Sequence, residues 1–126
     1  MEFINPAQLG TAIAPYSQGV VMGDVLHMAG QVSMDASGEI VGVDDIEAQV
    51  HHVLDRIEAV LAERGATLRN VGIATVYLVD RALYPGLNKA WSERFGAHHP
   101  VRSLVVSELV KPGLLVAIQA AAELPA

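Results

Sequence analysis

The chain has 126 residues, enough for one hydrophobic core, and we predict a single domain over residues 1–126. Its formal net charge is −6 with only eight Lys and Arg residues, which argues against general nucleic-acid binding because phosphate contacts require a basic surplus. The absence of cysteine excludes disulfides, thiol catalysis and thiolate metal sites.

The composition is apolar for a water-soluble domain. Hydrophobic residues make up 52% of the chain and charged residues 17%, against roughly 25% charged in typical domains. We therefore expect some apolar surface to contact another subunit. The apolar runs, such as residues 114–118, are shorter than the roughly 18 residues that span a bilayer, so we expect no membrane segment. No signal-peptide pattern is visible at the N-terminus, and we expect a cytoplasmic protein.

The first predicted element is a β-hairpin in residues 19–32. Two short apolar runs flank Gly23-Asp24, a dipeptide that suits a tight turn with positive φ. Residues 35–41 carry a second turn signal ahead of a short extended piece.

A long amphipathic helix is predicted over residues 45–64. Its start carries Asp44 and, three residues later, Glu47, which resembles a capping box, and Gly65 supplies a left-handed stop. One apolar stripe runs along it, made of Ile46, Val50, Val53, Leu54, Ile57, Val60 and Leu61.

The second half of the chain predicts a strand over 70–80, a helix over 82–95 with Pro85 in its first turn, and a final strand pair. The pair consists of residues 101–109 and 114–124, joined by a turn at 110–113. This order indicates an α+β fold with both helices on one face of the sheet. The other face is then apolar and uncovered, which favours oligomerisation.

Arg102 is the charged residue whose position raises a question, because it opens a run of β-branched residues. It is either a surface salt-bridge partner or an anion clamp. Arginine is permanently charged, and its planar fork matches a carboxylate, so a small acidic ligand is the functional alternative.

Four motifs together resemble the Rid family, also called YjgF-type or L-PSP proteins. They are "APYSQGV" at 14–20, "AGQV" at 29–32, the N…W…F pattern of Asn88, Trp91 and Phe95, and "HPVRS" at 99–103. The similarity covers about residues 10–123. It implies a chorismate-mutase-like mixed sheet, a homotrimer with active sites between subunits, and hydrolysis of small enamines and imines to 2-oxo acids and ammonia without a cofactor. The archetypal substrate is 2-aminoacrylate, and residues 108–113 echo a branch that acts on aminoacrylate from pyrimidine breakdown.

The resemblance also implies which residues form the site. Arg102 matches the arginine that binds the substrate carboxylate, and Gly30 and Tyr16 match the backbone N–H and the ring that line the same pocket. Gln119 stands where the archetypal deaminases hold the attacking water with a glutamate. The further substrate-binding candidates are Ala29, which replaces an archetypal serine, Asn88, Trp91 and His99.

Gln119 leaves the chemistry open, because a neutral amide can orient a water but cannot take up its proton. The substrate imine nitrogen can collect that proton, another residue such as His99 or Glu123 can act as base, or the protein has left deamination. The alternatives are then a non-catalytic protein that binds small carboxylates, or an enzyme with other chemistry on a carboxylated substrate. A ribonuclease is disfavoured by the net charge and by the lack of a His or Lys catalytic pair.

We expect no metal site. His51 and His52 are adjacent on the first predicted helix and point about 100° apart, so they cannot share a metal as an i, i+4 pair would, and His98 with His99 has the same defect. No Walker loop or dinucleotide fingerprint is present either.

Overall fold

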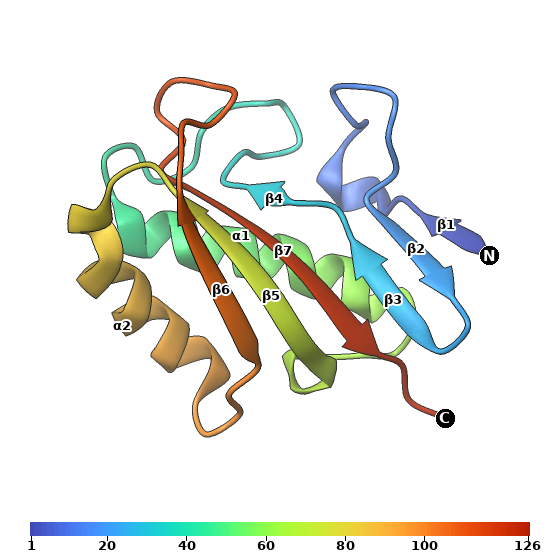
Figure 1. Cartoon of the computed structure of the whole chain (residues 1–126). Helices are drawn as coiled ribbons and strands as arrows, with labels where there is room; N and C mark the ends of the chain where they lie inside the picture. Colours follow the sequence, from blue (N-terminus) through green and yellow to red (C-terminus); the bar gives the residue numbers. More distant parts are fainter.

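The computed structural model describes all 126 residues, which form one mixed β-sheet and two α-helices (Figure 1). The helices are α1 (Ile46–Ala62) and α2 (Tyr84–Phe95), and short 3-10 turns are η1 (Ala7–Leu9), η2 (Leu68–Asn70) and η3 (Arg81–Leu83). The strands are β1 (Glu2–Ile4), β2 (Gly19–Met22), β3 (Val25–Met28), β4 (Gln31–Val32), β5 (Val71–Leu78), β6 (Val101–Val106) and β7 (Val116–Glu123).

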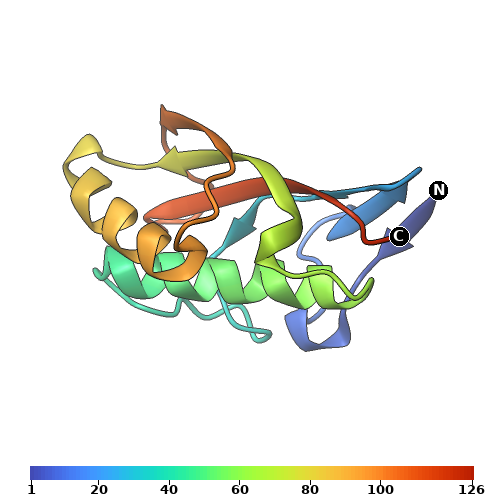
Figure 2. The ribbon, with the colours of Figure 1, turned by 90° about the horizontal axis from the view of Figure 1, so that it is seen from below.

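Both helices pack on the same face of the sheet, as predicted (Figure 2). The apolar stripe of α1 is buried there from Val50 to Leu61, with Ile46 partly buried, together with Leu87, Trp91 and Phe95 of α2. On the sheet side the core takes alternate residues of β5, because successive side chains of a strand point to opposite faces. Those residues are Ala74, Val76 and Leu78, and Val71 joins them because an irregularity between Val71 and Ile73 shifts the alternation.

The start of α1 differs from the prediction by one residue. Asp45, not Asp44, is the N-cap, and its Oδ1 accepts a hydrogen bond from the Ala48 N–H at 3.0 Å. Asp44 precedes the cap with φ 57°, a left-handed conformation that aspartate tolerates. The helix ends at Ala62, and Gly65 then adopts φ 66°, so the predicted left-handed stop is confirmed slightly beyond the last helical turn.

The predicted final strand pair is wrong. β6 and β7 do not pair with each other; they flank β5 on its two sides in the sheet order β1-β2-β3-β7-β5-β6, with β4 also on β7. β5, α2 and β6 form a βαβ unit, whose helical crossover brings β6 back parallel to β5 and leaves only the other edge of β5 for β7.

The predicted hairpin is confirmed as β2 and β3 around Gly23, which has φ 64°. The turn at 35–41 closes on a single bridge between Met34 and Ile40. β1 was not predicted; it adds an edge strand beside β2.

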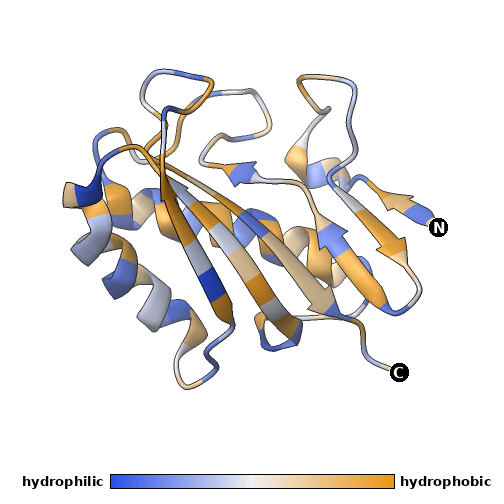
Figure 3. Ribbon diagram, in the orientation of Figure 1, coloured by the Kyte–Doolittle hydropathy of each residue, from blue (hydrophilic) through white to orange (hydrophobic).

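The sheet face opposite the helices, which we call the open face, is uncovered in the chain, and Figure 3 shows apolar segments along β2, β5 and β6. The strand register aligns one row across six strands: Phe3, Val20, His27, Ala121, Ile73 and Val101. Of these, Phe3 is 63%, Ile73 52% and Val101 65% exposed. The expected apolar, uncovered face therefore exists. Neither α-helix is long and apolar enough to cross a membrane.

Candidate functional site

Arg102 lies on β6 and points toward α2, because its register partner on β5 is Ala74, a buried residue of the helix-covered face. Its Nη2 donates to Oδ1 of Asn88 at 2.9 Å and, more weakly, to the Tyr84 hydroxyl at 3.4 Å. The guanidinium carbon lies 5.1 Å from the centre of the Trp91 ring and 5.7 Å from that of Tyr84. We call these four residues the Arg102 cluster.

The Arg102 cluster contains a cation without a counter-ion. No carboxylate lies within 4.0 Å of Arg102, so the surface-salt-bridge alternative is wrong. Asn88 and the two rings hold the guanidinium in place, while Nε and Nη1 have no partner in the chain. Nε and Nη1 are therefore available to donate to an anion. Tyr84 was missed from the sequence, although it precedes Asn88 and Trp91 by four and seven residues and so shares their side of α2.

A β-bulge interrupts the pairing with β7 at the point where β3 ends and β4 follows. On either side of it the register is His27 opposite Ala121 and Gln31 opposite Ile118. Residues 28–30 thus face only two residues of β7, Gln119 and Ala120, and one residue is extra. Bulges of this kind are frequent next to active sites because they redirect backbone groups.

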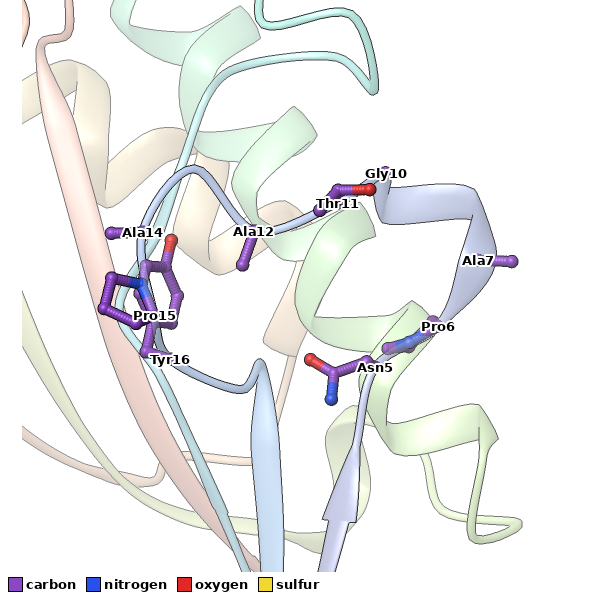
Figure 4. Close-up of a pocket in the computed structure, with 9 residues that line it drawn as sticks. All are labelled: Asn5, Pro6, Ala7, Gly10, Thr11, Ala12, Ala14, Pro15 and Tyr16. Atoms are coloured by element: carbon purple, nitrogen blue, oxygen red, sulfur yellow. The ribbon is translucent and has the colours of Figure 1, made fainter.

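The bulge exposes the Gly30 backbone. Its N–H donates to no backbone acceptor in the chain, and a Cβ added at Gly30 would meet no atom within 4 Å. Gly30 and Tyr16 line the same small cavity of about 40 Å³. Tyr16 also closes one end of a wider hollow of about 570 Å³ formed by the segment from Asn5 to Tyr16 (Figure 4).

Gln119 lies beside the bulge but on the open face. Its register partner is Thr75, which in turn pairs with Ser103, so a short polar row crosses β7, β5 and β6. A shallow hollow of about 190 Å³ lies over Gln119, Thr75 and His27. Ala29 lines a separate hollow on the other side of His27.

One chain does not bring Arg102 together with the bulge residues. Gln119 and Arg102 point to opposite faces of the sheet, as their register partners Thr75 and Ala74 do. Gly30 and Arg102 are separated by β7 and β5, about 14 Å at the usual strand spacing. A small enamine acid measures only about 5 Å from end to end. It cannot contact both groups of the same chain.

The two candidate replacement bases lie apart from Gln119. Glu123 is exposed at the end of β7, four residues or about 13 Å along the strand. His99 is exposed in the loop before β6 and makes no hydrogen bond. The other three histidines of the two adjacent pairs have hydrogen-bond partners: His51 bonds Glu93, His52 the Met34 carbonyl and His98 the Val71 carbonyl. No group of three or more metal-ligating side chains occurs.

The chain is similar to known proteins both in sequence and in fold. The sequence model of the family described as endoribonuclease L-PSP matches residues 7–124. The chain is 32% identical over 121 residues to 3-aminoacrylate deaminase RutC of Acinetobacter baylyi, covering 96% of both chains.

Among solved structures, a protein described as an endoribonuclease from Thermotoga maritima superposes with a TM-score of 0.91 at 31% identity, over 100% of this chain and 99% of its own. The Rid-family protein YyfA from Yersinia pestis gives 0.90 at 29% identity, over 98% of both chains. The mixed sheet with two helices on one face is therefore a fold that these proteins share.

Proposed function

The chain belongs to the endoribonuclease L-PSP family, of the Rid/YjgF type, and from this membership we propose that it deaminates small carboxylated enamines and imines. The observation that carries the proposal is Arg102, a fixed guanidinium with no carboxylate partner and free donors. Its planar fork fits the carboxylate common to 2-aminoacrylate and 3-aminoacrylate. The name of the Acinetobacter relative supports the same substrate class.

The reaction requires water and no cofactor. After the enamine tautomerises to its imine, a water oxygen adds to the imine carbon, the C–N bond breaks, and ammonia leaves an oxo acid behind. Arg102 holds the carboxylate, the Gly30 N–H donates to a polar group of the substrate, and the Gln119 amide orients the water. Because Gln119 cannot accept a proton, the proton of the water goes to the imine nitrogen, which must be protonated before it leaves.

The proposal includes a homotrimer, since the site of one chain is incomplete. Arg102 and the bulge residues of the same chain cannot contact one small substrate, so the Arg102 cluster of one copy is paired with Tyr16, Gly30 and Gln119 of its neighbour. The exposed apolar row on the open face supports this association, because a surface of this kind is stabilised by burial against other copies.

Gln119 also favours a second candidate. A site that keeps the anion clamp but lacks the carboxylate that the archetypal deaminases use would bind a small acid without turning it over. The protein would then sense a small 2-oxo or amino acid. The same assay separates the two candidates.

The decisive assay generates the substrate in place, because free aminoacrylates are short-lived. A pyridoxal-phosphate dehydratase acting on serine supplies 2-aminoacrylate, and the release of 2-oxo acid is followed with and without the purified protein. We expect faster release with the wild type and only the spontaneous rate, with no acceleration, with Arg102→Ala. Arg64→Ala removes a surface arginine paired with Glu2 and is the matched control; it should behave as wild type.

Acceleration that persists in Arg102→Ala would refute the anion clamp. If the wild type does not accelerate release of the oxo acid from either aminoacrylate, deamination is refuted, and calorimetric binding of pyruvate by wild type but not by Arg102→Ala would then support the binding candidate.

A further inference from the structure

Arg56 of α1 is half-buried and makes no ion pair. Its Nε donates to Oε1 of Gln31 at 3.0 Å, and its Nη1 donates to the Met34 carbonyl at 2.8 Å. Burial lowers the pKa of Arg56, while Tyr16 and Asp35 act in the opposite direction. A guanidinium held in the interior by neutral acceptors costs free energy. An apolar side chain at this position would leave the Gln31 and Met34 acceptors without these donors.

Arg56 fixes the orientation of the buried Gln31 amide. A guanidinium has donors only, so Gln31 must turn its Oε1 toward Arg56. Its Nε2 is then directed to Oε1 of Gln18 at 2.8 Å and to the Ala29 carbonyl at 3.3 Å. With the amide reversed, its NH₂ group would face the guanidinium and both of these acceptors would lose their donor.

The Ala29 carbonyl belongs to the same peptide group as the Gly30 N–H. A trans peptide is planar, and its C=O and N–H point in opposite directions. The N–H of Ala29 is held as well, by the Gln18 carbonyl at 2.8 Å. With its carbonyl bound to Gln31, this peptide directs the Gly30 N–H away from the buried amides, where no backbone acceptor of the chain meets it.

We propose that Arg56 is a positioning residue, which acts through Gln31 to aim the Gly30 N–H at the substrate. The proposal rests on the proposed function and deepens it. It also gives a role to the two motif glutamines, Gln18 of "APYSQGV" and Gln31 of "AGQV", which meet in this network.

The test is Arg56→Met, which keeps an unbranched apolar side chain like the stem of arginine and removes its donors. We expect kcat to fall about tenfold with KM nearly unchanged, because Arg102 still binds the carboxylate while one transition-state donor is misaligned; complete removal of such a donor costs about 100-fold or more. The second readout is the Gly30 amide resonance in a ¹⁵N-labelled sample, which should shift and exchange faster with solvent.

Two variants separate positioning from a structural role. His52 shares the Met34 carbonyl with Arg56, at 3.0 Å, but has no hydrogen bond to Gln31, so His52→Ala should keep both kcat and the Gly30 resonance. Arg56→Lys retains a group that only donates, and it should restore kcat to within about threefold of wild type. Loss of kcat in His52→Ala equal to that in Arg56→Met would overturn the proposal.

If Arg56→Met does not fold, Gln31→Glu replaces it. The carboxylate keeps a bond to Arg56 but has no donor for the Ala29 carbonyl, so the same loss of kcat and the same shift at Gly30 are expected. A folded Arg56→Met or Gln31→Glu with wild-type kcat and an unchanged Gly30 resonance would show the idea to be wrong. If the wild type has no deaminase activity, the proposed function fails, and the resonance alone still decides whether Arg56 positions Gly30.

Discussion

Arg102 and Arg56 are two arginines without carboxylate partners, and they differ in what their donors contact. Arg102 is partly exposed at the β6 edge of the sheet; only Nη2 has a partner in the chain, and aromatic rings flank the guanidinium. Arg56 is half-buried against the bulge, where its Nε donates to Gln31 and its Nη1 to a backbone carbonyl. The difference teaches that the nitrogens used within the chain indicate the role of an arginine. Arg102 is held through Nη2 and leaves Nε and Nη1 for a ligand, whereas Arg56 uses Nε and Nη1 to hold an amide and a backbone carbonyl.

The strongest test of this comparison is to replace each arginine by methionine. Arg102→Met should lower kcat/KM about 100- to 1,000-fold, because a hydrogen-bonded carboxylate loses its charged partner, while the thermal midpoint stays near wild type. Arg56→Met should instead lower the free energy of unfolding by about 1 to 3 kcal/mol, since buried acceptors lose their donor. Steady-state kinetics and urea unfolding measure the two effects. Equal destabilisation by both replacements would remove the distinction.

The next test asks whether the Arg102 cluster of one chain meets the bulge residues of another chain only in the assembled oligomer. Ile73→Lys places a charge on the open face, opposite to the face toward which Arg102 points, at a position that is exposed in the single chain. We expect a folded monomer by analytical ultracentrifugation and about 100-fold lower activity per chain, because burying an unpaired ammonium opposes assembly. Ala62→Lys, at an exposed residue at the end of α1, is the control and should leave assembly intact. A fully active Ile73→Lys monomer would refute the shared site.

A smaller effect is expected at the bulge itself. Gly30→Ala should lower kcat about tenfold by crowding the N–H that faces the ligand, with little change in stability, because the new Cβ meets no atom of the chain. The comparison variant is Gly86→Ala, whose Cβ would lie 2.5 Å from Cγ2 of Ile46 and should cost about 1 to 2 kcal/mol of stability. Kinetics and thermal unfolding of the pair distinguish a ligand-facing glycine from a packing glycine. Wild-type kcat in Gly30→Ala would argue against a role for this N–H.

The smallest expected effect is at Gln119, whose side-chain amide is neutral. Gln119→Glu should raise kcat about fivefold near neutral pH by adding a base for the water. The gain should disappear as the pH falls through the carboxyl pKa, usually about 4.3, because only the ionised form accepts a proton. Rate profiles of wild type and variant between pH 4 and 8 measure it. An unchanged or lower rate would mean that Gln119 is itself suited to the reaction.

Local patterns predicted much of the fold. The stripe from Ile46 to Leu61 gave α1 within two residues at each end, and Gly23 marked the hairpin turn, because helix periodicity and turn conformation depend on neighbouring residues. Strand order was mispredicted where it depends on distant segments. The turn at 110–113 suggested that β6 and β7 pair, whereas β5 lies between them.

The residues of the candidate site also divide into those that motifs predicted and those that only the fold brought to light. Arg102, Asn88 and Trp91 were identified from motifs, and the structure brings them together because Asn88 and Trp91 share one side of α2. Arg56 carried no signal, since an arginine within an amphipathic helix is typical of a solvated face. Its contact with Gln31 spans 25 residues and exists only once α1 packs under β4.

The sequence by itself determined the helices, the hairpin, the single charged position at the start of β6 and the family, because these rest on short-range periodicity and on the order of motifs along the chain. The tertiary structure alone decided that Arg102 and Gln119 point to opposite faces, that the ladder bulges at Gly30, and that Arg56 supports it. These features depend on strand register, where a shift of one residue reverses the face of every side chain, and register is set by packing between segments far apart in the chain.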